Sequence, residues 1–138
     1  MNTHIARRTH GADGFTLIEL LVVISLVMIL SSVAMASYRQ SVISAKEAAL
    51  KSDLFHMRDA IDQYYADKGY YPESLQTLVS EQYLRDVPRD PFTDSKDTWT
   101  TIPADPEPGS TRASAGIWDV KSGSDGISIR DGSRYADW

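Results

Sequence analysis

The chain has no cysteine and only three histidines among its 138 residues. The lack of cysteine excludes a disulfide framework. Two of the histidines, His4 and His10, lie in the first ten residues, so His56 alone is left in the rest of the chain. The chain therefore has few residues that could act as the histidine base of a hydrolase, and no other pairing of a nucleophile with a base is visible. We expect a protein that is not an enzyme.

An excess of positive charge is lacking as well, since the formal net charge is -5 at pH 7. An acidic protein repels the phosphate backbone of nucleic acids, so nucleic-acid binding is disfavoured as its main function. Roughly 100 residues follow the most apolar stretch, a size at which hydrophobic burial exceeds the cost of folding only narrowly. A bound metal ion or oligomerisation would add the stability that such a small domain lacks.

Glycine and proline are both missing from residues 15–68, and Gly69 follows where a helix commonly ends. Apolar side chains recur at three- and four-residue steps in the second half of this stretch, namely Ile43, Leu50, Leu54, Met57, Ile61 and Tyr64. The pattern predicts one long helix whose later part, residues 38–68, is amphipathic and packs against a globular head made by residues 69–138. The alternative is two helices separated near residues 37–40.

Residues 15–37 form an almost unbroken apolar run. A helix of roughly 23 residues, rising 1.5 Å per residue, crosses a hydrocarbon layer of about 30 Å. We therefore predict a membrane-spanning helix. Arg7 and Arg8 precede the run, so the positive-inside rule places the N-terminus in the cytoplasm and the head on the other side of the membrane.

One acidic residue, Glu19, interrupts the apolar run. An ionised carboxylate in such surroundings costs a few kcal/mol and needs a partner or a function. Thr16 stands three residues earlier, so one interpretation is a capping box that satisfies amides of the first helical turn. The other is an ion pair between copies of the chain. If the chain is cut after Gly14, the new amino group of Phe15 is a cation that a shifted neighbour can bring to Glu19.

The stretch GFTLIELLVVISLVMILSSVAMASY, residues 14–38, resembles the N-terminal signature of type IV pilins and type II secretion pseudopilins. The resemblance implies that residues 1–14 are a leader removed by prepilin peptidase after Gly14. It implies that Phe15 becomes the N-methylated first residue and that Glu19 guides the registration of subunits. It also implies a pilin-like α+β fold, with a long helix and a small antiparallel sheet. Asp13 departs from these leaders, which are commonly basic there.

The first part of the head predicts one short helix and one short strand. Pro72 suits the first position of a helix within YYPESLQTLVSEQYL. Residues 99–102 form a short strand between two loops that are rich in proline.

The segment GIWDVKSGSDGISI, residues 116–129, has the pattern of a β-hairpin. Apolar residues alternate with polar ones on both sides of an SGSDG turn, and these are Trp118, Val120, Ile127 and Ile129. We expect the hairpin to lie on the amphipathic part of the long helix, with Trp118 and Trp138 as the largest residues of the shared core.

Three aspartates, Asp125, Asp131 and Asp137, recur at six-residue steps in a stretch rich in glycine and serine. Oxygen ligands on a flexible backbone suit a hard cation such as calcium. The spacing does not match an EF-hand loop, and Asp-Gly pairs are also ordinary turn formers. The residues alone leave both interpretations open.

The segments LQTLVSEQYLRDVPRDPF and GIWDVKSGSDG and the final RYADW are similar to the C-terminal half of the major pseudopilins of type II secretion, a family with a calcium site in its last loops. The similarity implies that Asp125 and Asp137 are acidic calcium ligands. Main-chain oxygens near Val120 and Ser122 would complete the shell, and Asp131 is either an added ligand or a turn former. The turn is shorter here, and the family's glycine-glutamate run is missing.

With the resemblance, these features lead us to expect the major structural subunit of a periplasmic pseudopilus, which is anchored in the bacterial inner membrane and then polymerises to export folded proteins. The implied partners are further copies of the chain, minor pseudopilins, the inner-membrane assembly platform, prepilin peptidase and, before assembly, membrane lipid. One alternative is the pilin of a surface type IV pilus used for adhesion, motility or DNA uptake, against which the lack of cysteine argues. Another is a monomeric, membrane-anchored calcium-binding module.

Overall fold

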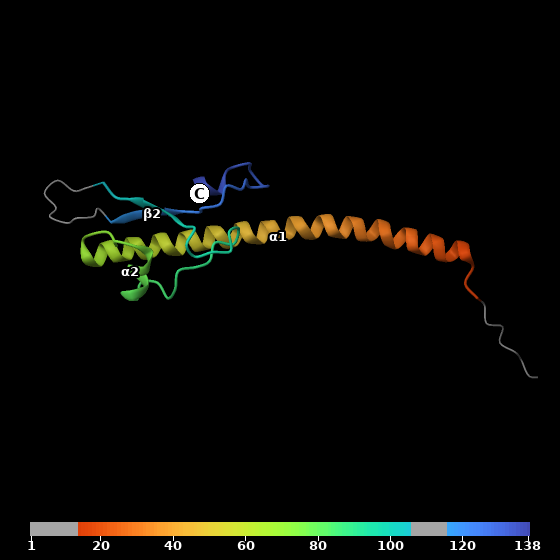
Figure 1. The fold of residues 1–138 in the computed structure, drawn as a ribbon, viewed down its shortest axis with the longest axis horizontal. Helices are drawn as coiled ribbons and strands as arrows, with labels where there is room; N and C mark the ends of the chain where they lie inside the picture. The colour runs from red at the N-terminus through yellow and green to blue at the C-terminus, as the bar shows by residue number, and fades with distance from the viewer. Residues whose placement is uncertain (1–13, 106–115) are drawn as a thin grey trace, which may run out of the picture. The chain divides into compact units, whose positions relative to one another are not determined.

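The computed structural model describes residues 14–105 and 116–138; the expected leader residues 1–13 and the prolines Pro106 and Pro108 lie outside them. The described elements are the helices α1 (Leu17–Lys68) and α2 (Leu75–Ser80), the strands β1 (Thr100–Pro103) and β2 (Ile117–Lys121), and a single 3-10 turn, η1 (Tyr135–Asp137). They form two compact units, one ending at Arg39 and one covering Gln40–Trp138. The fold is α+β, as the sequence predicts (Figure 1).

Helix α1 begins and ends with the signals that its sequence contains. The Thr16 hydroxyl accepts a hydrogen bond from the Glu19 amide at 3.2 Å. At the other end Gly69 adopts a positive φ of 75° and donates its N–H to the Tyr65 carbonyl at 2.8 Å, which is a helix stop that glycine adopts without strain. Helical structure is unbroken from Leu17 to Lys68, so the alternative of two separate helices is wrong.

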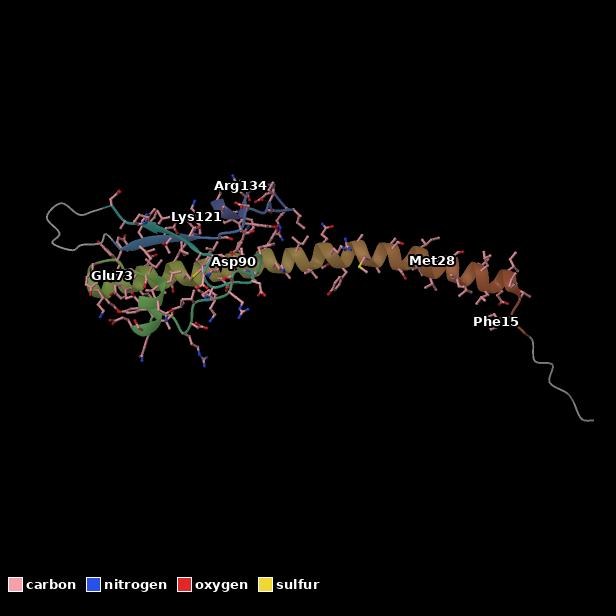
Figure 2. All side chains as sticks on the ribbon, in the orientation of Figure 1. Phe15, Met28, Glu73, Asp90, Lys121 and Arg134 are labelled. Atoms are coloured by element: carbon pink, nitrogen blue, oxygen red, sulfur yellow. The ribbon has the colours of Figure 1, made fainter. Side chains whose placement is uncertain are left out.

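The first unit contains the apolar half of α1, and its side chains are exposed. They stand out from the ribbon on both sides around Met28 (Figure 2). By length and composition this is a helix able to cross a membrane, and none of its apolar window is buried. Ser25 and Ser32 donate their hydroxyls to the carbonyls four residues earlier, each at 2.8 Å. Their polar groups are thereby satisfied within the helix, as an apolar environment requires.

The second unit is the head, in which the later part of α1 supplies one wall of a hydrophobic core. Of the apolar stripe predicted on this helix, only Ile43 is not buried. The buried apolar residues of the core are Leu50, Leu54, Met57, Ala60, Ile61, Tyr64, Leu75, Leu78, Val87, Trp99, Ile117, Val120 and Tyr135. Strand β2 lies alongside α1 in this unit (Figure 1).

The short helix of the head starts later than expected. Pro72 is not its first residue, because α2 begins at Leu75. Ser74 is the N-cap: its backbone is extended and its hydroxyl accepts a hydrogen bond from the Thr77 amide at 3.2 Å. The serine supplies the oxygen that satisfies this amide, whereas Pro72 is buried before the helix.

The predicted C-terminal hairpin is wrong, since β2 pairs instead with β1. The two strands are antiparallel, with Thr101 opposite Val120. Just after β2, Gly123 passes so close to the Thr98 carbonyl that a Cβ atom on it would lie 1.9 Å from that oxygen. In the described part of this segment the pairing is a single isolated bridge between Ile127 and Arg134.

Trp118 is not a core residue. It is 49% exposed, while Ile117 and Val120 are the buried positions of β2. The register of the strand pair shifts between Ile102 and Pro103. Of the two residues predicted to face inward on β2, Val120 is buried and Trp118 is not. Trp99 is the buried tryptophan of the head.

Candidate functional sites: the N-terminus of α1 and the C-terminal clamp

The predicted processing and assembly residues lie together at the start of α1. Gly14 and Phe15 precede the helix, and the Phe15 side chain is 80% exposed. Glu19 is exposed in the first turn. Thr16 caps the amide of Glu19, so the threonine half of the predicted capping box is present. Among the described residues no ion pair involves Glu19, which leaves its pairing with another copy a prediction.

The three aspartates of the predicted calcium site differ in their surroundings. Asp125 is almost fully exposed and lies 3.6 Å from the Arg134 guanidinium. Asp131 accepts hydrogen bonds from the amide and the hydroxyl of Ser133, at 3.1 and 2.7 Å. These bonds lower the pKa of Asp131 to about 2. They are typical of an aspartate that stabilises a turn. Asp137 is exposed in η1.

The main-chain and serine positions of that site are engaged with other groups. The Val120 carbonyl accepts a hydrogen bond from the Arg58 guanidinium at 2.9 Å. Ser122 is buried, and its hydroxyl donates to Asp90 at 2.6 Å. Within residues 14–105 and 116–138 no group of three or more histidine, cysteine, aspartate or glutamate side chains is placed to hold a metal ion. The conformation described does not gather the expected ligands into a shell, and calcium stays a prediction.

A buried glutamate, Glu47, joins α1 to the last segment of the chain. It is 4% exposed and accepts hydrogen bonds from the Ile129 amide at 3.0 Å and the Tyr135 hydroxyl at 2.9 Å. Burial alone raises the pKa of Glu47. The hydrogen bonds, with contributions from Ser128 and Arg130, outweigh it, so the pKa of Glu47 lies below its ordinary value. Burial, together with the same contact to Glu47, raises the pKa of Tyr135 to about 12.

Arg58 makes a second connection between α1 and the end of the chain. Its guanidinium pairs with the Asp119 carboxylate at 2.6 Å and donates to the main-chain oxygens of Val120 and Trp138, each at 2.9 Å. We call the set formed by Glu47, Arg58 and their partners the C-terminal clamp. It binds β2 and the residues around η1 to the helix by charge-assisted hydrogen bonds.

A second buried acid, Asp90, organises the loop between α2 and β1. It is fully buried and accepts hydrogen bonds from the Phe92 amide at 2.8 Å and from the Ser122 hydroxyl (Figure 2 labels Asp90). Its backbone forms an isolated bridge with Ser95. The loop that carries Pro88 and Pro91 is thereby attached to the residue that follows β2.

Sequence patterns did not identify the clamp. One signal was present, because Glu47 falls four residues after Ile43 and three before Leu50, and an acid within an apolar stripe needs a buried partner. Arg58 carries no such signal. Its partner Asp119 is far away in the sequence, and only the folded chain brings the two together.

Comparison with known proteins now adds to this geometry. Residues 10–35 match the family model described as the prokaryotic N-terminal methylation motif. The chain is 32% identical to type II secretion system core protein G of Klebsiella pneumoniae over 95 residues, which covers 57% of this chain and 68% of the relative. It is 36% identical over 79 residues to the fimbrial protein EcpC of Eikenella corrodens, covering 54% of this chain and 52% of that relative.

A third relative is the type IV major pilin protein PilE1 of Neisseria gonorrhoeae, 40% identical over 63 residues, which cover 44% of this chain and 28% of that relative. No solved structure matches the chain with significance. The chain therefore spans about half the length of the fimbrial relative and about two thirds of core protein G.

The chain belongs to the family of type IV pilins and pseudopilins. Membership makes it a structural subunit and not an enzyme, and implies polymerisation and processing by prepilin peptidase. The exposed apolar helix agrees with anchoring in the inner membrane before assembly. Within the family, similarity is shared between core protein G and the pilins of surface fibres.

Proposed function

We propose that this protein is the major subunit of a periplasmic pseudopilus in a type II protein secretion system, assembled through α1 to drive the export of folded proteins. The observation that carries the proposal is the extent of similarity. The match to core protein G of Klebsiella pneumoniae covers 68% of that relative, whereas the match to PilE1 covers 28% of the pilin. The first match extends beyond the N-terminal helix, which all members share, into the head.

Assembly is proposed to begin from the membrane. Before assembly the apolar half of α1 lies in lipid, with the head in the periplasm. Lipid and neighbouring helices are both apolar surroundings, so transfer of the exposed apolar side chains into a filament changes their hydrophobic free energy little. The specificity of assembly then depends on Glu19, whose carboxylate pairs with the amino group of Phe15 on a neighbouring copy. Head-to-tail contacts that do not close into a ring extend as a filament.

The role of Glu19 is tested by cross-linking in intact cells. Glu19→Gln removes the charge and keeps the size, and we expect the ladder of cross-linked subunits to fall at least about tenfold because one buried ion pair per subunit is lost. Thr16→Ala is the matched control, since it removes only the capping bond to the Glu19 amide. An equal loss of the ladder in both variants would show that capping is the main function of this turn.

The class of filament is tested by deleting the gene in its native host and restoring it. The proposal expects loss of folded exoproteins from the medium, with surface fibres unchanged. The reverse result, normal export with loss of surface fibres or twitching, would identify a pilin of a surface type IV pilus. That second candidate is favoured by the 40% identity to PilE1 and the 36% identity to EcpC. Pull-down of minor pseudopilins and the assembly platform checks the remaining partners.

We also propose that calcium binds in the last loops, with Asp125 and Asp137 as carboxylate ligands and Asp131 or the main chain at Ser122 as further ones. Support comes from the oxygen-only character of this segment and the resemblance to pseudopilins. When bound, the ion would stabilise the head by mass action. We expect calcium to raise the unfolding temperature of the wild type and not of Asp125→Asn. If calcium does not raise the unfolding temperature of the wild type, the calcium proposal is wrong.

A further inference from the structure

Three oxygen atoms from two parts of the head, strand β2 and the residue after η1, converge on one positively charged group. The Nε atom of Arg58 lies 2.6 Å from a carboxylate oxygen of Asp119. Its Nη2 atom lies 2.9 Å from the main-chain oxygens of both Val120 and Trp138. The carboxylate oxygen also accepts the Val120 amide at 2.7 Å. Helix α1, strand β2 and the residue that follows η1 therefore meet at this guanidinium.

The arrangement suits a cation because the three acceptors around the guanidinium are all oxygen atoms. A guanidinium keeps its charge at all accessible pH values and presents N–H donors in a rigid plane. The Asp119 side chain is 15% exposed and that of Arg58 37%, so solvent screens the pair only partly. Hydrogen bonds from a charged donor in such a place are stronger than those between neutral groups.

We propose that Asp119, Val120 and Trp138 form a cation site which Arg58 fills from within the chain, and that removing the Arg58 side chain opens this site to guanidinium ions from solution. A calcium ion that used the Val120 oxygen would share that atom with the guanidinium, and two cations at one oxygen repel each other. Calcium in the last loops must then draw on other oxygens. The proposal concerns the head alone and holds for either kind of filament.

The test is chemical rescue of Arg58→Ala in the full chain, purified in detergent. All three tryptophans, Trp99, Trp118 and Trp138, belong to the head, so their fluorescence reports its unfolding without a signal from the membrane helix. We expect the unfolding temperature to fall by about 5 °C or more. Millimolar guanidinium chloride should then raise it, while equal sodium chloride, which lacks the planar donors, and equal urea, which has the shape without the charge, should not.

Two controls make the result decisive. Arg134→Ala removes an arginine that contacts Asp125 at 3.6 Å on the surface, and guanidinium should not stabilise it. If Arg58→Ala does not fold, Asp119→Asn and Arg58→Lys replace it, because both retain part of the site. Each should lower the unfolding temperature, and the double variant should fall by less than the sum of the two. The proposal is wrong if Arg58→Ala is as stable as the wild type or if urea raises its unfolding temperature as much as guanidinium does. It is also wrong if the losses of Asp119→Asn and Arg58→Lys are strictly additive in the double variant.

Discussion

The two units of this protein use apolar side chains in opposite ways. The unit ending at Arg39 exposes them all along its part of α1, for example Leu17 at 85% and Met35 at 56%. In the head, the continuation of the same helix buries Leu50, Met57 and Ile61 completely. Both halves of α1 carry large apolar side chains, on all sides of the helix in the first unit and in one stripe in the head. The distinction lies in whether the same chain supplies a covering layer.

The acidic residues of the two units also differ in whether their own unit supplies a partner. Glu19 in the first unit has its backbone amide capped but makes no ion pair among the described residues, and its pairing with another copy is the proposal made above. Glu47 in the head is buried with two donors from its own unit. Glu47 stabilises the folded head, whereas the role proposed for Glu19 is in assembly. Substitutions that are matched between the two units test this comparison.

The largest expected effect is on the core. Leu54→Ala removes a side chain that is 2% exposed and should lower the free energy of unfolding of the head by about 2 to 5 kcal/mol. Leu21→Ala removes the same atoms from a position that is 61% exposed and should leave head unfolding unchanged. Tryptophan fluorescence in denaturant measures both. Equal losses would mean that the two units fold together.

The next effect concerns the clamp at Glu47. Glu47→Gln keeps an acceptor oxygen but loses the charge-assisted bonds to Ile129 and Tyr135, at a cost of about 1 to 2 kcal/mol. Glu73→Gln, on the surface, is the control and should change little. Because the pKa of Glu47 is lowered in the fold, its contribution is present above the unfolded pKa and is lost as pH falls. As pH falls below the ordinary glutamate value of 4.5, the two proteins should therefore converge in stability.

These two positions also show what could be predicted from sequence. Leu54 and its stripe were predictable because helical periodicity is local, and so were the helix stop at Gly69 and the cap at Thr16. Strand pairing was not, because β1 and β2 are joined by a long connection and the SGSDG turn looked sufficient for a hairpin. The burial of Trp99, which precedes β1 and donates its indole N–H to the distant Pro88 carbonyl at 2.8 Å, was not predictable either.

The candidate sites also differ in how far they could be predicted from the sequence. Gly14, Phe15 and Glu19 are contiguous in sequence, so the motif could be recognised without a structure. The C-terminal clamp could not, because Arg58 and Asp119 come together only after the head has folded. Aspartate spacing alone also did not reveal that Asp131 is engaged with Ser133.

A smaller effect is expected at Asp131. Its pKa is lowered to about 2, chiefly by hydrogen bonds from Ser133. A carboxyl with a lowered pKa stabilises the fold above its unfolded value of 3.8, and this stabilisation disappears as pH falls toward 2. Asp131→Asn should therefore flatten the acid limb of a plot of unfolding temperature against pH. An unchanged acid limb would contradict the assignment of Asp131 as a turn former.

The smallest effect is expected at the ion pair of Arg134 with Asp125. Both side chains are largely exposed and their atoms are 3.6 Å apart, a geometry that contributes less than about 0.5 kcal/mol. Arg134→Ala should unfold within error of the wild type at physiological salt. A loss comparable to that of Glu47→Gln would show that the last loop is held by more than the clamp.

The central claim is that α1 is prepared for assembly by cutting the chain between Gly14 and Phe15. Intact mass and N-terminal analysis of the native protein tests it most directly. The account predicts a polypeptide that begins with N-methylated Phe15. A functional native protein that still begins with the arginine-containing residues 1–14 would contradict it.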